Sequence, residues 1–84
     1  MKIKVLGPGC FFCKKLHEMT INALAELDLA AEVEHVHDWK EIMRYVPATP
    51  GLVIDGKVKH YGKPLPSLER VKQLIREEAE KGAS

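Results

Sequence analysis

The sequence has few of the features that mark membrane-spanning, secreted or nucleic-acid-binding proteins. No apolar run approaches the ~20 residues that a helix needs to span a bilayer. The first residues, MKIKVLGPG, contain too short an apolar patch for a secretory signal. The formal net charge is only +1, from 13 Lys+Arg against 12 Asp+Glu, whereas phosphate binding usually needs a basic excess. We therefore expect no membrane and no nucleic-acid partner, and a cytoplasmic location.

Cysteine is also scarce, because Cys10 and Cys13 are the only two in the chain. Thiols in the cytoplasm are kept reduced, so structural disulfides are rare there. A disulfide that closes so short a loop would contribute roughly 2 kcal/mol, which makes it a poor structural crosslink. A lone CxxC in such a protein more often indicates redox or metal chemistry.

The length and the residue patterns predict one domain over residues 1–84 with the element order β-α-β-α-β-β-α. The expected elements are a strand at 2–6, a helix at 11–28, a strand at 31–37, a short helix between Asp38 and Pro47, a hairpin around Asp55-Gly56, and a helix from Ser67 to before Gly82. Asp-Gly is the dipeptide preferred in a two-residue type I′ turn. Asp38 and Ser67 are the expected N-caps of their helices.

These elements predict an α/β fold with a mixed four-stranded sheet and helices on both of its faces. The first β-α-β unit should pair two strands in parallel, and the hairpin should add antiparallel strands. The polar segment 31–37 suits an edge of the sheet. We expect Phe12 and Met19 to pack in the core, and His35, His37 and His60 to be solvated edge residues.

The CxxC pair follows a strand and opens a helix, which makes the two sulfurs unequal. As the helix N-cap, Cys10 would face the unpaired N–H groups of the first turn and the positive end of the helix dipole. These groups, together with Lys14, should lower the pKa of Cys10 below that of a free thiol. Cys13, one turn inside the helix, should be sheltered. This asymmetry predicts that Cys10 attacks a disulfide and that Cys13 resolves the mixed disulfide.

Two other functions are compatible with the same residues. Cys10, Cys13 and His17 fall at i, i+3 and i+7 on one helix face, which is a possible ligand set for zinc or copper. Soft-metal carrier domains that present such a motif end in a strand, however, and this chain is expected to end in a helix. The third possibility is a protein-interaction domain with an incidental dithiol.

The segments KIKVLGPGCFFC, TPGLVIDGKV and GKPLPSLERVKQLI together resemble the thioredoxin fold in its minimal form. More closely, they resemble the small redox-active disulfide group of thioredoxin/glutaredoxin-like proteins. The resemblance implies that Pro50 is cis and packs against the CxxC, and that the backbone of Thr49 pairs with an extended substrate. We add Gly9 and Phe11 to this substrate-facing surface. The alternative for Phe11 is packing beneath the Gly7–Gly9 loop.

The sequence departs from the family pattern on the first strand, where thioredoxins bury an acidic residue and this chain has Lys4. We expect Lys4 to stabilise a thiolate. The chain also lacks the Gly-Gly turn and following acid with which glutaredoxins bind glutathione. We therefore predict a monomeric thiol–disulfide oxidoreductase without cofactor or metal. Its partners would be a disulfide-bearing protein substrate and an upstream reductase.

Overall fold

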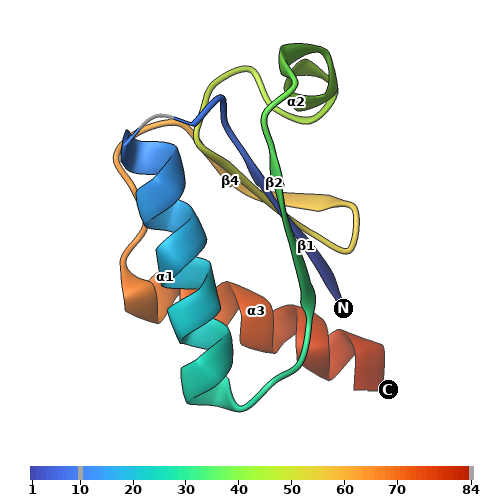
Figure 1. Cartoon of the computed structure of the whole chain (residues 1–84). Coiled ribbons are helices and arrows are strands. Elements are labelled where there is room, and N and C mark those ends of the chain that lie inside the picture. Colours follow the sequence, from blue (N-terminus) through green and yellow to red (C-terminus); the bar gives the residue numbers. More distant parts are fainter. Residues whose placement is uncertain (10, 84) are drawn as a thin grey trace.

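The computed structural model describes residues 1–9 and 11–83, and this part of the chain forms a four-stranded sheet packed between helices (Figure 1). The elements are β1 (Lys2–Leu6), α1 (Phe11–Leu27), β2 (Glu32–Val36), α2 (Trp39–Tyr45), β3 (Gly51–Ile54), β4 (Lys57–Tyr61) and α3 (Leu68–Ala83). The predicted element order is confirmed. The last helix is longer than expected, because it includes Gly82 instead of ending before it.

The sheet has the strand order β2-β1-β3-β4. β1 pairs with β2 in parallel, with Val5 opposite His35, and pairs with β3 in antiparallel, with Leu6 opposite Gly51. β4 continues the hairpin on the outer side of β3. The predicted mixed sheet and the edge position of residues 32–36 are therefore confirmed. All four residues of β3 are buried, as expected for an inner strand covered on both faces.

Alternating side chains of the two inner strands divide the core into two layers. One layer lies under α1 and α3 and contains most of the buried volume; its fully buried members include Ile3, Val5, Leu16, Leu52, Ile54, Val71 and Ile75. The other layer lies under the short α2 and consists of Leu6, Val36, Ile42, Val46 and Val53. Helices thus cover both faces of the sheet, with the longer pair on one side and α2 on the other.

The hairpin and helix starts follow from local sequence. Asp55 and Gly56 have φ values of 49° and 81°, the pair of positive values that a type I′ turn requires. Asp38 caps α2, because its side chain accepts a hydrogen bond from the N–H of Lys40 at 3.0 Å. Ser67 accepts one from the N–H of Arg70 at 3.1 Å in the same way. Each of these features depends on residues that are neighbours in the chain.

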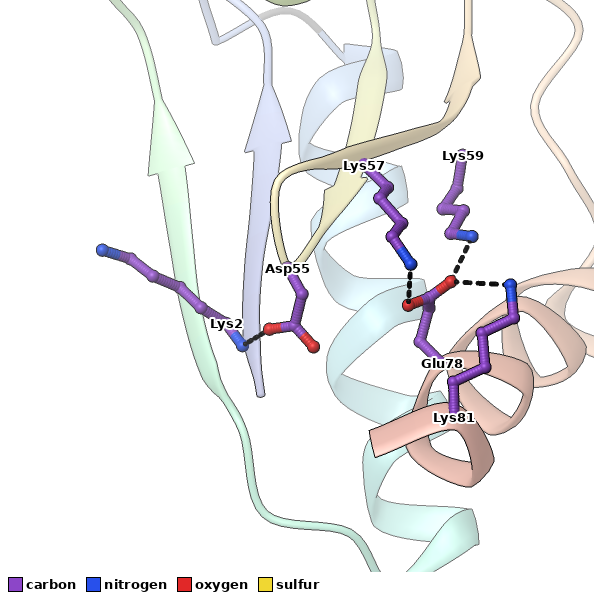
Figure 2. Close-up of polar contacts among 6 residues, drawn as sticks. All are labelled: Lys2, Asp55, Lys57, Lys59, Glu78 and Lys81. Carbon is purple, nitrogen blue, oxygen red and sulfur yellow. Dashed lines mark hydrogen bonds and ion pairs between the residues drawn. The ribbon is translucent and has the colours of Figure 1, made fainter. Parts of the chain in front are cut away.

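A buried carboxylate fastens α3 to the outer strand of the hairpin. Glu78 is only 4% exposed. Its carboxylate forms ion pairs with Lys57 and Lys59 of β4 and with Lys81 of its own helix (Figure 2). The hydrogen bond from Lys59, followed by the charges of Lys57 and Lys81, lowers the pKa of Glu78 from 4.5 to about 2. The side chain is therefore ionised throughout the physiological pH range.

The described part of the chain contains no helix that is both long and apolar enough to cross a membrane.

Candidate functional site

The loop after β1 and the loop before β3 meet at one end of the sheet. Leu6 pairs with Gly51, so the next residues outward, Gly7 and Pro50, leave the antiparallel ladder side by side. The peptide bond between Thr49 and Pro50 is cis, as the family resemblance implies. Pro50 is buried and Thr49 is half-buried. The register therefore brings the segment that carries the CxxC next to the Thr-Pro segment, although the two are about half the chain apart.

Cys13 is completely buried, and it lies directly against the backbone of Gly7. A Cβ atom placed on Gly7 would lie 2.6 Å from the Cβ of Cys13 and closer still to its sulfur. Gly7 does not have a left-handed φ, so the position requires glycine for space alone. The first turn of α1 is thus packed on the loop that precedes it, with the sulfur of Cys13 at the contact. The sheltered position predicted for Cys13 agrees with this burial.

The electrostatic environment at the start of α1 is positive. The first turn contains no acidic residue, and the exposed Lys14 and Lys15 follow it directly. The helix dipole adds a partial positive charge at the same place. Cys10 lies outside the described residues, so its predicted N-cap position and the effect of Lys14 on its thiol stay predictions.

Two aromatic side chains lie on the surface beside the motif. Phe11 is 71% exposed, which contradicts the alternative that it packs beneath the Gly7–Gly9 loop. Phe12 is 37% exposed, so the prediction that it belongs to the core is wrong. The buried face of α1 is instead the one that carries Cys13 and Leu16, and Met19 packs at its margin. The rings of Phe11 and Phe12 meet edge to face with centroids 5.5 Å apart.

The turn after β4 also reaches this end of the molecule, which the sequence did not predict. Gly62 donates its N–H to the carbonyl oxygen of Pro50 at 2.9 Å. The ammonium of the next residue, Lys63, lies 4.3 Å from the centre of the Phe12 ring, within the range of a cation–π interaction. Lys63 therefore links the Thr-Pro segment to the first turn of α1. The segment YGKPLP contains turn residues, but no local pattern identifies what a turn contacts.

Lys4 does not have the expected role beside the cysteines. Its neighbours in the strand, Ile3 and Val5, point to the layer under α1, so Lys4 points to the opposite face. There its ammonium donates to Glu41 at 3.2 Å and to the hydroxyl of Tyr45 at 3.3 Å. These two partners on α2 raise the pKa of Lys4. The prediction that Lys4 stabilises a thiolate is therefore wrong, because alternation along the strand turns its side chain away from α1.

Three histidines from separate positions in the sequence gather beside the Gly7–Gly9 loop. The rings of His35 and His37 are stacked with centroids 4.2 Å apart, and His17 of α1 lies 5.3 Å from His35. His37 also approaches Gly9, whose added Cβ would lie 3.6 Å from Nδ1 of His37. The prediction of solvated edge residues holds for the exposed His37. It is wrong for His35, which is half-buried with its Nε2 atom fully enclosed.

His60 is not a simple solvated edge residue either. Its side chain is half-buried, and its Nε2 atom lies 3.1 Å from the carbonyl oxygen of Gly62.

The metal-binding alternative used Cys10, which lies outside the described residues, together with Cys13 and His17. Within residues 1–9 and 11–83, no group of three His, Cys, Asp or Glu side chains is arranged to hold a metal ion. His17, the third ligand of the proposed set, lies against His35.

The α/β fold, the cis proline and the buried Cys13 at the start of α1 are together the features of a thioredoxin-like protein. Comparison with known families agrees, because residues 1–76 match the model of the thioredoxin domain family. The chain is 35% identical over 74 residues to a thioredoxin of Methanocaldococcus jannaschii, covering 88% of this chain and 85% of that protein. It is 34% identical over 76 residues to a thioredoxin of Methanothermobacter thermautotrophicus, covering 89% and 97%. The chain therefore belongs to the thioredoxin domain family, and its role is of the oxidoreductase type.

Proposed function

We propose that the protein is a small thiol–disulfide oxidoreductase whose CxxC pair exchanges electrons with disulfides of partner proteins. The observation that carries this proposal is the enclosure of Cys13 against Gly7 at the first turn of a helix without acidic residues. A thiol in this place is protected from bulk reagents. It can react only with a sulfur presented at the helix start, where Cys10 precedes Phe11.

The proposed reaction has two steps. The thiolate of Cys10 attacks the partner disulfide; one S–S bond forms as another breaks, and the first leaving sulfur takes up a proton. The thiol of Cys13 then loses its proton and attacks the sulfur of Cys10. This second exchange closes the Cys10–Cys13 disulfide and releases the partner as a dithiol. Two electrons have moved from this protein to the partner, and a reductase must return them.

The positive start of α1 supports the choice of Cys10 as the nucleophile. Lys14, the helix dipole and the absence of acidic residues in the first turn all favour a thiolate over a thiol at this end. Cys13 is one turn further in and fully buried, so a partner protein cannot reach it first. These two environments match the roles of attacking and resolving thiols.

The partner would bind across the end of the sheet where the two loops meet. We assign the half-buried Thr49 to pair its backbone with an extended segment of the substrate, beside Pro50. The exposed ring of Phe11 offers an apolar contact on the other side of the motif. Gly9 stays in this assignment as a prediction from the sequence; its φ is 98°, and a Cβ placed there would lie 3.6 Å from Nδ1 of His37. Lys63, above Phe12, adds a positive charge to this surface.

The remaining features of the proposed function rest on the sequence. A single monomeric domain, a cytoplasmic location and an upstream reductase stay predictions. The same holds for the independence from glutathione, which follows from the missing Gly-Gly turn.

Replacing the resolving cysteine tests the proposal directly. The variant Cys13→Ser should form a mixed disulfide with a protein substrate that persists until dithiothreitol is added, because the second step is blocked. The matched variant Cys10→Ser should form no such adduct with the same substrate, since its remaining thiol is enclosed. Equal trapping by the two variants would contradict the assignment of roles. Absence of a Cys10–Cys13 disulfide after equilibration with oxidised glutathione would contradict the function itself.

A further inference from the structure

The end of the sheet that carries the CxxC has a positive charge that the described part of the chain does not neutralise. Most lysines elsewhere in this part form ion pairs with carboxylates; these are Lys4, Lys57, Lys59, Lys72 and Lys81. By contrast, Lys14, Lys15 and Lys63 are exposed and form no ion pair with any described residue. We call these three residues the motif lysines.

The segments that meet at this end contain almost no acidic residue to offset the motif lysines. None occurs in the first turn of α1, nor in the connecting residues 7–9, 46–50 and 62–67. Asp38, in the connection from β2 to α2, is the exception, and its carboxylate already accepts the N–H of Lys40. Glu18 lies one turn further along α1 than Lys14. The unbalanced charge therefore arises from the assembly of this end, since its lysines come from two remote segments.

Two of the motif lysines lie beside the same aromatic ring. The ammonium of Lys63 lies 4.3 Å from the centre of the Phe12 ring. A cation held over a ring has less freedom to lose on binding a partner than an unrestrained lysine side chain has. Lys15 comes three residues after Phe12 and so projects from the same face of α1, where it lines a groove with Glu18, Met19 and Leu68. Phe12 thus has a positive charge from each of two different segments beside it.

We propose that the protein prefers partner disulfides flanked by acidic residues, whose carboxylates bind the motif lysines while the disulfide meets the CxxC. The proposal rests on the proposed function and adds the class of substrate to it. Opposite charges raise the rate of encounter, and like charges disfavour partners with basic residues at the same place. The exposed Phe11 supplies an apolar contact, so the matching segment combines an apolar residue with carboxylates. A nucleic acid is a poorer match, because the net charge of the chain is only +1.

Peptides that differ only in the charge beside one disulfide test this preference. They share the same intramolecular disulfide and carry a pair of glutamates, glutamines or lysines next to it. Each peptide is mixed with the reduced protein in the absence of oxygen. The Cys10–Cys13 dithiol is oxidised to its disulfide as one peptide disulfide is reduced to a dithiol, so the electrons balance without a further reagent.

The rate constant of this single turnover is obtained by acid quenching and chromatography of the peptide. The flanking charges also change the intrinsic reactivity of the peptide disulfide. Each rate constant is therefore divided by the rate constant for reduction of the same peptide by dithiothreitol under the same conditions. The normalised value reports only how the protein distinguishes the peptides.

At low ionic strength, the normalised rate constant should be about tenfold or more higher for the glutamate peptide than for the lysine peptide. This ratio should fall below about twofold in about 0.5 M NaCl, because salt screens exposed charges. It should also fall about threefold or more in Lys15→Glu and in Lys63→Glu. Arg76→Glu is the matched control, because it makes the same change of charge at an exposed position in the third turn of α3. It should change the ratio by less than about twofold.

Equal normalised rate constants for the three peptides, or a faster reaction of the lysine peptide, would overturn the acidic preference and leave the proposed function intact. A preference for the glutamate peptide that survives in both Lys15→Glu and Lys63→Glu would overturn the assignment to the motif lysines. If the reduced protein reacts with none of the peptides, the proposed function fails, and the substrate class inferred from it fails with it.

Discussion

The contact between Gly7 and Cys13 gives the sharpest quantitative prediction. In Gly7→Ala, the new methyl group would lie 2.6 Å from the Cβ of Cys13, whereas carbon atoms in contact normally lie about 3.5–4.0 Å apart. The sulfur lies closer still. The position of the Cys13 Cβ is fixed by the backbone and does not change when the side chain rotates, so the loop or the first turn of α1 must move. Overpacking of this kind costs about 1–3 kcal/mol, and the depth of the overlap places Gly7→Ala near the upper end.

This cost converts into a measurable change in melting temperature. At roughly 2.1 cal/mol/K per residue, 84 residues give an unfolding entropy near 0.18 kcal/mol/K, so each 1 kcal/mol lowers Tm by about 6 °C. We therefore expect Gly7→Ala to lower Tm by about 11–17 °C. Thermal unfolding followed by circular dichroism measures this shift, and urea titration gives the free energy independently.

Gly51→Ala is the matched control at the same end of the sheet. Its new methyl group would meet the side-chain tips of Val46 at 3.2 Å and of Leu6 at 3.3 Å, which can move by a few tenths of an ångström. Its cost should stay below about 1 kcal/mol. In a Cys13→Ala background, which removes the sulfur, the cost of Gly7→Ala should fall by about 1 kcal/mol or more. An equal cost in both backgrounds, or equal costs at Gly7 and Gly51, would refute the reasoning.

Three further predictions concern separate parts of the molecule. Because the pKa of Glu78 is lowered to about 2, its stabilising effect is complete above its unfolded pKa of 4.5 and is lost as the pH falls toward 2. Glu78→Gln should therefore be less stable than the parent at pH 7 in urea titrations, with a difference that shrinks at pH 3; a constant difference would contradict this. At Gly56, φ is 81° and an added Cβ would meet no atom within 4 Å. Gly56→Ala should therefore lower the free energy of unfolding by about 1–2 kcal/mol through backbone strain alone. An unchanged Tm would be inconsistent with the type I′ turn. Phe11→Ser should change the free energy of unfolding by less than about 0.5 kcal/mol. The variant should reduce insulin more slowly than the parent does, but should reduce a small aliphatic disulfide at the parent's rate. Equal effects on both substrates would exclude a docking role for Phe11.

Local sequence patterns predicted the elements well, because each depends on residues close together in the chain. The Asp55-Gly56 turn, the caps at Asp38 and Ser67, and the parallel and antiparallel pairings all agree with the structure. The errors also have a local cause. Helical periodicity identified a stripe that includes Phe12, but the helix is rotated so that Cys13 faces inward and Phe12 lies on the surface.

The roles of individual polar residues could not be derived from the sequence, because they depend on pairs that are distant in the chain. Glu78 looks like a solvated residue of α3, yet it is buried by lysines of β4. Lys4 looks like a neighbour of the thiols, yet the alternation of β1 turns it toward Glu41 on the other face. Which charge meets which partner is decided only when the sheet is assembled.

The amino-acid sequence by itself determined the order of strands and helices and the position of the hairpin, since residue type and spacing dictate these properties. Tertiary structure alone decided which atoms enclose the thiol of Cys13. Gly7 covers its sulfur, because the start of α1 packs on the loop after β1, and the N–H of Gly7 donates to the carbonyl oxygen of Val36 in β2. Contacts of this kind arise from the packing of complete elements, and no short segment of the chain encodes them.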